Sequence, residues 1–277
     1  MSHLHLKILA ILLFAAAGLR LGAMPSPESS LKGKNVVILG DSNTWLGGDD
    51  CSDPRGWTYE WVRETTPRWC RSYARSGATW TNTAATRLNT KENISVLGDD
   101  NTIYNQIMRL KEDLDSMKVP RPDLVIIAAG TNDIWFASKR PSLLDVNAES
   151  AMVIPDSDIL ACEPGEVVTL AESLRYGCEI IENMLPSAKV VIFTPMQFTK
   201  ANSQRFETVT TLMERMGEMM EIDVVRQDKE LEINAASERK ALKLTRDGVH
   251  TNREGAARNG RYLARRICAL YDGKSGD

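Results

Sequence analysis

The sequence feature that most constrains the fold is an unbroken apolar run at residues 36–39, which is followed by Gly40-Asp41-Ser42-Asn43. The run lacks the alternation of a half-exposed strand and predicts a parallel strand covered on both faces. Gly40 permits a tight exit from such a strand. Ser42 then follows the strand's carboxyl end, where open α/β sheets bind their ligands. A serine there is a candidate nucleophile if other residues supply a base and an oxyanion hole.

Strand-like and helical patterns alternate along the rest of the chain. Further strands are predicted at residues 71–76, 124–129, 189–194 and 222–226. Apolar residues at helical spacing predict helices around residues 57–66, 103–117, 170–185, 206–220 and 263–270. This alternation implies a mostly parallel sheet with right-handed crossovers. We expect one α/β domain with three layers, α/β/α, over residues 35–277, preceded by a polar leader at residues 24–34.

Residues 1–23 predict a secretory signal peptide. Lys7 precedes an apolar run at residues 8–19, and small residues follow up to Ala23. The run is shorter than the roughly 20 residues that span a bilayer, and no cysteine follows it closely for lipid attachment. We therefore expect a secreted or periplasmic protein without a stable membrane anchor. An uncleaved amphipathic anchor is the alternative.

Charge and cysteine content narrow the possible partners. The net charge of −3 gives no electrostatic case for binding nucleic acid or an anionic membrane. Export would permit disulfides, and Cys51 and Cys70, in or beside irregular segments, are the pair predicted to be bonded. Cys178 and Cys268 fall on helical apolar stripes as small core residues. Neither a paired Cys-x-x-Cys motif nor EF-hand spacing occurs, so no metal or cofactor is expected.

The candidate base is His250, because the other two histidines of the chain, His3 and His5, lie in the predicted signal peptide. Asp247 precedes His250 by three residues and could bond its Nδ1 atom. That contact would fix the tautomer and leave Nε2 facing a serine hydroxyl. A lone histidine is more often structural than catalytic, so this pair needs support from other motifs.

Two further motifs end predicted strands and could complete an oxyanion hole. Gly77 follows the second predicted strand, and Asn132 lies in the Gly130-Thr131-Asn132-Asp133 segment after the third. The backbone amides of Ser42 and Gly77 and the neutral side-chain amide of Asn132 are suitable donors. Each could instead be an ordinary turn residue. The motifs around Ser42, Gly77, Asn132 and His250 are much less expected to occur together by coincidence than any one of them alone.

Together these motifs resemble the SGNH hydrolases of the GDSL esterase/lipase superfamily, over about residues 35–271. The resemblance implies a flavodoxin-like five-stranded parallel sheet. It also implies Ser42 as nucleophile, His250 as base and Asp247 as its partner, with Ser42, Gly77 and Asn132 forming the oxyanion hole. Asn43 stands where the name-giving motif has Leu, which slightly favours carbohydrate esterases over lipases. Asp41 is interpreted as holding the turn.

Two other enzyme classes lack their motifs. The nucleophile elbow of α/β-hydrolases needs Gly-x-Ser-x-Gly, but Thr44 follows Ser42 at the second glycine position. A phosphate-binding P-loop is also absent from the sequence.

The predicted function is a secreted serine esterase that cleaves short-chain esters, with acetyl as the expected acyl group, on a carbohydrate or other polar alcohol. Residues 134–167 show no periodicity and are expected to form a loop bordering the site. Charges interrupt this segment, unlike a lipid-covering lid. Trp45 and Trp80 lie near Ser42 and Gly77 and either stack on sugar rings or belong to the core. A non-catalytic glycan-binding protein, an acyltransferase and a lipase or lysophospholipase remain alternatives.

Overall fold

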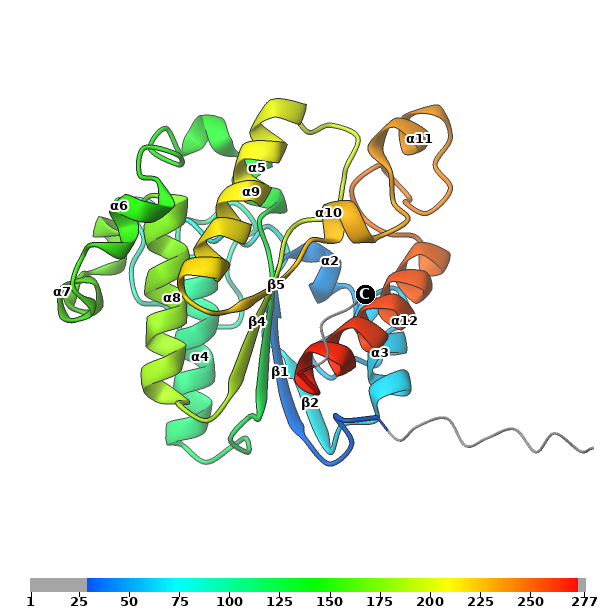
Figure 1. Cartoon of the computed structure of the whole chain (residues 1–277), viewed down its shortest axis with the longest axis horizontal. Helices are drawn as coiled ribbons and strands as arrows, with labels where there is room; N and C mark the ends of the chain where they lie inside the picture. The colour runs from blue at the N-terminus through cyan, green and yellow to red at the C-terminus, as the bar shows by residue number, and fades with distance from the viewer. Residues whose placement is uncertain (1–28, 274–277) are drawn as a thin grey trace, which may run out of the picture.

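The computed structural model of the protein describes residues 29–273 (Figure 1). It contains a sheet of five parallel strands in the order β2-β1-β3-β4-β5, which is the flavodoxin-like order that the family resemblance implied. The strands are β1 (Asn35–Gly40), β2 (Trp69–Ser72), β3 (Leu124–Ala128), β4 (Lys189–Phe193) and β5 (Asp223–Val225). The predicted signal peptide and the first part of the predicted leader lie outside the described residues.

Helices cover both faces of this sheet, which confirms the three-layer α/β/α prediction (Figure 1). Val37 and Val125 face one helical layer, whereas their neighbours Val36 and Leu124 face the other. This burial on both sides explains why the strands read as unbroken apolar runs. The main helices on the first side are α4 (Ile103–Asp115), α8 (Leu170–Met184) and α9 (Ser203–Met219). Those on the second side are α3 (Trp57–Thr65) and α12 (Arg253–Tyr271).

Residues 134–167, expected to form a loop without regular structure, instead contain several short helices. Each is too brief to produce a readable apolar period, which explains the wrong prediction. The α-helices among them pack against α8 or α9, and the buried Arg175 of α8 bonds Asp156 and the Ala151 carbonyl. The short elements are α5 (Thr131–Trp135), η1 (Ala137–Lys139), α6 (Ala148–Met152), α7 (Asp156–Ala161) and η2 (Pro164–Glu166).

The second strand also differs from its prediction, beginning at Trp69 and ending at Ser72 rather than covering residues 71–76. It is an edge strand with partly exposed residues, so no apolar run marks its start. After Ser72 the chain continues beside β1, because Tyr73 N–H donates to the Ile38 carbonyl and Arg75 N–H to that of Gly40. These two hydrogen bonds place the turn at Gly77 beside the end of β1, although β2 itself ends earlier than predicted.

The disulfide predicted between Cys51 and Cys70 is not formed in this structure. Their Sγ atoms are 3.7 Å apart, whereas a disulfide bond measures about 2.05 Å. Both residues are free thiols. The sequence therefore identified two neighbouring cysteines, but not a bond between them.

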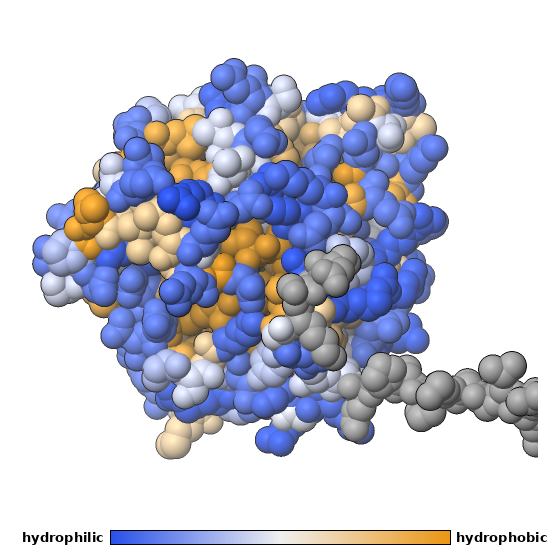
Figure 2. Space-filling model, viewed as in Figure 1, coloured by the Kyte–Doolittle hydropathy of each residue, from blue (hydrophilic) through white to orange (hydrophobic). Residues whose placement is uncertain are grey.

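The surface facing the viewer in Figure 2 is largely hydrophilic, with hydrophobic residues in separate patches. None of the helices within residues 29–273 is both long enough and apolar enough to span a membrane.

The end of β1 is held by the side chain of Gln106, which is fully buried in α4. Its Oε1 accepts from Gly40 N–H at 2.8 Å, and its Nε2 donates to the Gly40 carbonyl at 2.8 Å. One side chain thus satisfies both polar backbone groups of the residue that precedes the Asp41-Ser42 turn.

Replacing Gln106 by Ala should lower the free energy of unfolding by about 2 kcal/mol, because it removes the side-chain acceptor of the buried Gly40 N–H and leaves the Gly40 carbonyl with only the Arg75 N–H of its two donors. Urea unfolding of the wild type and the variant measures this loss. The exposed Gln204 of α9 provides a control, and Gln204→Ala should change stability by less than about 0.5 kcal/mol. Equal effects of the two substitutions would contradict this assignment.

Candidate active site

Ser42 is the first residue of the short helix α2 (Ser42–Trp45), which begins directly after β1. Asp41 caps this helix by accepting a hydrogen bond from Asn43 N–H at 3.1 Å. This arrangement agrees with the interpretation of Asp41 as the residue that holds the turn. The abrupt change from strand to helix places Ser42 at the carboxyl edge of the sheet, where it is 6% exposed.

His250 reaches Ser42 from the loop that precedes α12. Its Nε2 lies 2.9 Å from Ser42 Oγ, and its Nδ1 lies 2.7 Å from Asp247 Oδ2. Asp247 Oδ1 also accepts from the backbone N–H groups of His250 and Val249, at 2.7 and 3.0 Å. The structure therefore brings the three residues singled out in the sequence into one hydrogen-bonded chain.

The environment of Asp247 keeps its carboxylate ionised. Partial burial alone would raise its pKa, but hydrogen bonds from the backbone and ring of His250 and from Val249 N–H outweigh that effect. The pKa of Asp247 is therefore below its ordinary value. An ionised carboxylate at Nδ1 favours a proton on that nitrogen, which leaves Nε2 as the acceptor for the Ser42 hydroxyl.

The loop that carries His250 is organised by Glu238 of α11 (Ala235–Lys240), a residue that the sequence analysis missed. The Glu238 carboxylate is buried and accepts hydrogen bonds from the N–H groups of Leu244 and Thr245 and from the Thr245 hydroxyl. Burial would raise the pKa of Glu238, but these bonds lower it overall. Thr245 Oγ1 in turn accepts from Gly248 N–H at 3.2 Å. No motif marks Glu238, because it lies in a charged connection.

Asn43 joins the nucleophile helix to the histidine loop on both sides of His250. Its Nδ2 donates to the Val249 carbonyl, and its Oδ1 accepts from Thr251 N–H, both at 3.3 Å. The sequence analysis noted Asn43 only as a departure from the family motif. Its bridging contacts were missed because both partners lie more than 200 residues away.

The predicted oxyanion donors lie around the same strand ends. Gly77 has a φ of +84°, and an added Cβ would approach the Val96 carbonyl oxygen to 2.3 Å, so only glycine fits. Asn132 is buried, and its Nδ2 donates to the Ala78 carbonyl at 2.9 Å. This bond orients the amide and uses one of its two N–H groups. Within residues 29–273, the backbone N–H groups of Ser42 and Gly77 have no protein acceptor.

Asp133, the last residue of the Gly130–Asp133 motif, fixes the segment that follows Gly77. Its buried carboxylate accepts from the N–H groups of Trp80 and Thr81 and from the Thr81 hydroxyl. Trp80 is 2% exposed and belongs to the core, so the sugar-stacking interpretation of Trp80 is wrong. Trp45, in contrast, is 45% exposed.

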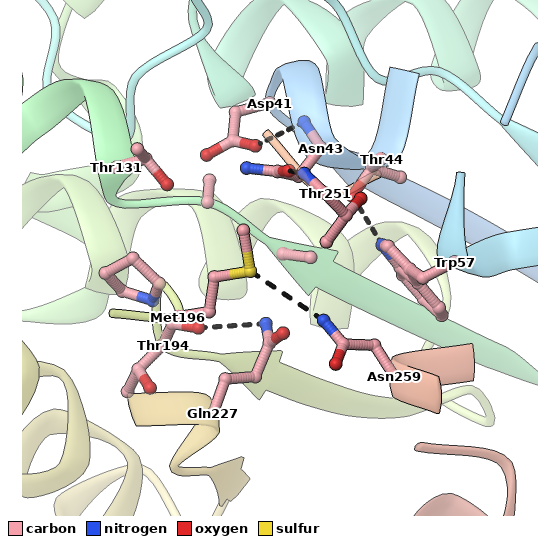
Figure 3. Close-up of a pocket in the computed structure, with 13 residues that line it drawn as sticks. Asp41, Asn43, Thr44, Trp57, Thr131, Thr194, Met196, Gln227, Thr251 and Asn259 are labelled. Carbon is pink, nitrogen blue, oxygen red and sulfur yellow. Dashed lines mark hydrogen bonds between the residues drawn. The ribbon is translucent and has the colours of Figure 1, made fainter. Parts of the chain in front are cut away.

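A small cavity lies beneath the nucleophile helix and is lined by Asp41, Asn43 and Thr251 among others (Figure 3). Its volume is about 20 Å³, close to the minimum of roughly 10–15 Å³ that holds one water molecule. The cavity is therefore too small to receive an acyl group. Elsewhere in residues 29–273, no cluster of three or more His, Cys, Asp or Glu residues is arranged to hold a metal ion.

Comparison with known proteins identifies the family and agrees with the fold. Residues 38–258 match the GDSL-like lipase/acylhydrolase family, and the chain belongs to that family. The matched region begins within β1 and includes Ser42, Gly77, Asn132 and His250. The protein is thus a member of a hydrolase family, as its motifs had indicated. No curated protein matches the chain.

Several solved structures share the fold at low sequence identity. An acetyl xylan esterase, AlAXEase, has a TM-score of 0.52 and 16% identity, with 84% of this chain and 99% of that one covered. A protein from Lactobacillus plantarum has a TM-score of 0.58 and 14% identity, covering 88% and 99%. A protein from Bacteroides ovatus with a provisional GDSL-like lipase assignment has a TM-score of 0.53 and 18% identity, covering 85% and 98%.

The pKa of Asp41 predicts a pH-dependent loss of stability. Burial raises this pKa to about 6, although Thr131 and Asn43 donate hydrogen bonds to the carboxylate. The unfolded chain releases the proton near pH 4, so stability falls as the pH rises from about 4 to 6. The loss is then complete at higher pH and amounts to at most about 3 kcal/mol.

Asp41→Asn removes this titration while keeping a helix-capping side chain. The variant should gain stability relative to the wild type at pH 8 but not at pH 4. Denaturant unfolding of both proteins at the two pH values provides the measurement. The same stability difference at pH 4 and pH 8 would contradict the raised pKa.

Proposed function

We propose that this protein is a serine esterase that hydrolyses short-chain esters, mainly acetyl esters, on carbohydrates. The observation that carries the proposal is the chain of hydrogen bonds from Ser42 through His250 to Asp247. Family membership supports a hydrolase, and the reaction needs no cofactor. We also propose, from the predicted signal peptide, that the protein is exported and that its partner is a small-molecule or glycan ester.

The geometry suits a two-step reaction through an acyl-enzyme. Ser42 Oγ would attack the ester carbonyl as its proton moves to His250 Nε2, and Asp247 would stabilise the resulting imidazolium. The alcohol then leaves with the proton from His250. Water repeats the sequence on the acyl-enzyme, releasing the acid and restoring Ser42.

Charge on the carbonyl oxygen develops during both attacks. Backbone N–H groups of Ser42 and Gly77 and the remaining amide N–H of Asn132 are the proposed donors to this oxyanion. The first two have no acceptor among the residues that the structure describes, and the third belongs to an amide oriented by its bond to the Ala78 carbonyl. Donors fixed in advance need no reorganisation at the moment of reaction.

One feature favours a short acyl group. The short helices α5, α6 and α7 pack against α8 or α9, and charged residues interrupt the segment that contains them, so it supports no continuous apolar cover for a long acyl chain. A shared fold with an acetyl xylan esterase is compatible with the carbohydrate assignment.

Asn132→Ala should lower kcat by roughly 10²–10³-fold, equivalent to about 3–4 kcal/mol, because one oxyanion donor is lost. KM should change little, since this interaction strengthens in the transition state. Steady-state kinetics with a short activated ester gives both constants, and a thermal melt establishes that the variant is folded. A folded variant with near-normal kcat would restrict Asn132 to a turn-forming role.

The proposed function is tested by labelling and by acyl-length preference. An organophosphonate should add once per chain, on the Ser42 peptide, and Ser42→Ala should not be labelled. Among acetyl, butyryl and octanoyl esters of one alcohol, kcat/KM should be highest for acetyl. A preference for octanoyl would favour a lipase instead.

The remaining alternatives have their own outcomes. No turnover of any ester by a folded protein would favour a non-catalytic glycan-binding protein. Acetyl transfer to an added sugar in preference to water, seen by product analysis, would identify an acyltransferase.

A further inference from the structure

An open cleft of about 460 Å³ lies beside the proposed catalytic residues. Trp45 lines it from the last position of α2, the helix that begins with Ser42. Ser76 and Val96 also line it, next to Gly77 in sequence and in space. The cleft is therefore bordered by both segments whose backbone N–H groups are proposed to bind the oxyanion.

Trp45 gives this cleft an open aromatic surface. The tryptophans Trp57, Trp61 and Trp80 are buried. Trp135 is 40% exposed, but its ring stacks on Phe198 at 5.9 Å and has the Lys200 ammonium 5.3 Å from its centre. Trp45 is 45% exposed and has no aromatic or cationic partner among the described residues.

The polar lining of the cleft includes Glu92, Asn93 and the ion pair of Asp49 with Arg75. Arg75 Nη1 and Nη2 donate to the two oxygens of Asp49 at 2.8 and 3.3 Å, while Nη1 and Nε also bond the carbonyls of Ala74 and Glu92. The Arg75 side chain is only 12% exposed, whereas that of Asp49 is 43% exposed. Arg75 is thus committed to protein acceptors, and it fixes and neutralises a carboxylate that faces the cleft.

This combination suits one chemical class of ligand. A pyranose ring has an apolar C–H face that packs on an indole, and its hydroxyl groups are donors for a fixed carboxylate. The volume falls within the usual range of roughly 300–1,000 Å³ for small-molecule sites and far exceeds the needs of an acetyl group. A long acyl chain would instead desolvate the Asp49–Arg75 pair without replacing its hydrogen bonds.

We propose that this cleft is the subsite for the alcohol part of the substrate, and that it holds a sugar residue against Trp45 with its hydroxyls on Asp49. The inference rests on the proposed esterase function and adds the place where the glycan binds. Trp45 and Asp49 then determine specificity for the alcohol and take no part in bond breaking.

The test compares two acetyl esters with very different alcohols, acetylated xylo-oligosaccharides and vinyl acetate. Trp45→Ala should lower kcat/KM for the oligosaccharides roughly tenfold, mainly through KM, and change that for vinyl acetate by less than about twofold. Trp45→Phe should recover most of the loss because it retains a flat ring. Asp49→Asn should lower kcat/KM for the oligosaccharides severalfold, again with little effect on vinyl acetate.

Trp135→Ala is the matched control, because it removes a tryptophan of similar exposure whose ring is already engaged. It should leave the ratio of the two kcat/KM values unchanged. If Trp45→Ala leaves the ratio of the two kcat/KM values unchanged, whether both fall equally or neither falls, the subsite is overturned while the esterase function stays in place. A selective loss on octanoyl esters of the same small alcohol would assign the cleft to the acyl chain instead.

The proposed function fails in a different way. If the wild type cleaves vinyl acetate but no acetylated saccharide, the carbohydrate assignment and the sugar subsite are both overturned. If it cleaves neither ester, the esterase function itself is wrong, and the sugar subsite that rests on it is overturned too.

Discussion

The site depends on the parallel register between β1 and β3. Gly40 pairs with Ala128 at the carboxyl ends of these strands, so the turns that follow emerge side by side. The approach is close, since a Cβ on Gly40 would lie 2.6 Å from the Ala128 carbonyl oxygen. Asp41 N–H donates to that same carbonyl at 3.1 Å. This junction fixes where Ser42 and Asn132 emerge from the sheet. The two hydrogen bonds between Gln106 of α4 and Gly40 hold the end of β1 in place there.

Much of this arrangement could be predicted from sequence because the relevant signals are local. Unbroken apolar runs identified the central strands, and a polar motif directly after β1 or β3 must lie at the sheet's carboxyl edge. The Asp247–His250 contact spans three residues and follows from turn geometry. These features are sufficient to predict Ser42, Asn132 and His250 as residues that meet at one edge of the sheet.

The remaining features depend on contacts between distant segments. Glu238 is an unremarkable acid in a charged connection until folding buries it beneath the loop that carries His250. The start of β2 carries no apolar run because it lies at the sheet edge. Trp45 and Trp80 have equivalent local sequence contexts, yet one is half-exposed and the other buried. Only tertiary packing separates such cases, and sequence patterns do not report it.

Asp41 and Asp247 illustrate how the fold gives two nearby carboxyl groups different properties. Burial dominates at Asp41 and raises its pKa, whereas at Asp247 hydrogen bonds outweigh burial and lower the pKa. The acid in contact with His250 is therefore the more readily ionised of the two. Asp41 holds the turn before Ser42 through its hydrogen bonds. Its buried carboxylate lowers the stability of the folded protein at neutral pH.

The paired hydrogen bonds of Asn43 have a mechanical consequence. They attach the peptide groups on either side of His250 to the residue next to Ser42. The loop and the nucleophile turn are therefore tied to each other directly and not only through the sheet. Moving His250 away from Ser42 would require both of these bonds to lengthen or break, so Asn43 opposes separation of the two reacting side chains.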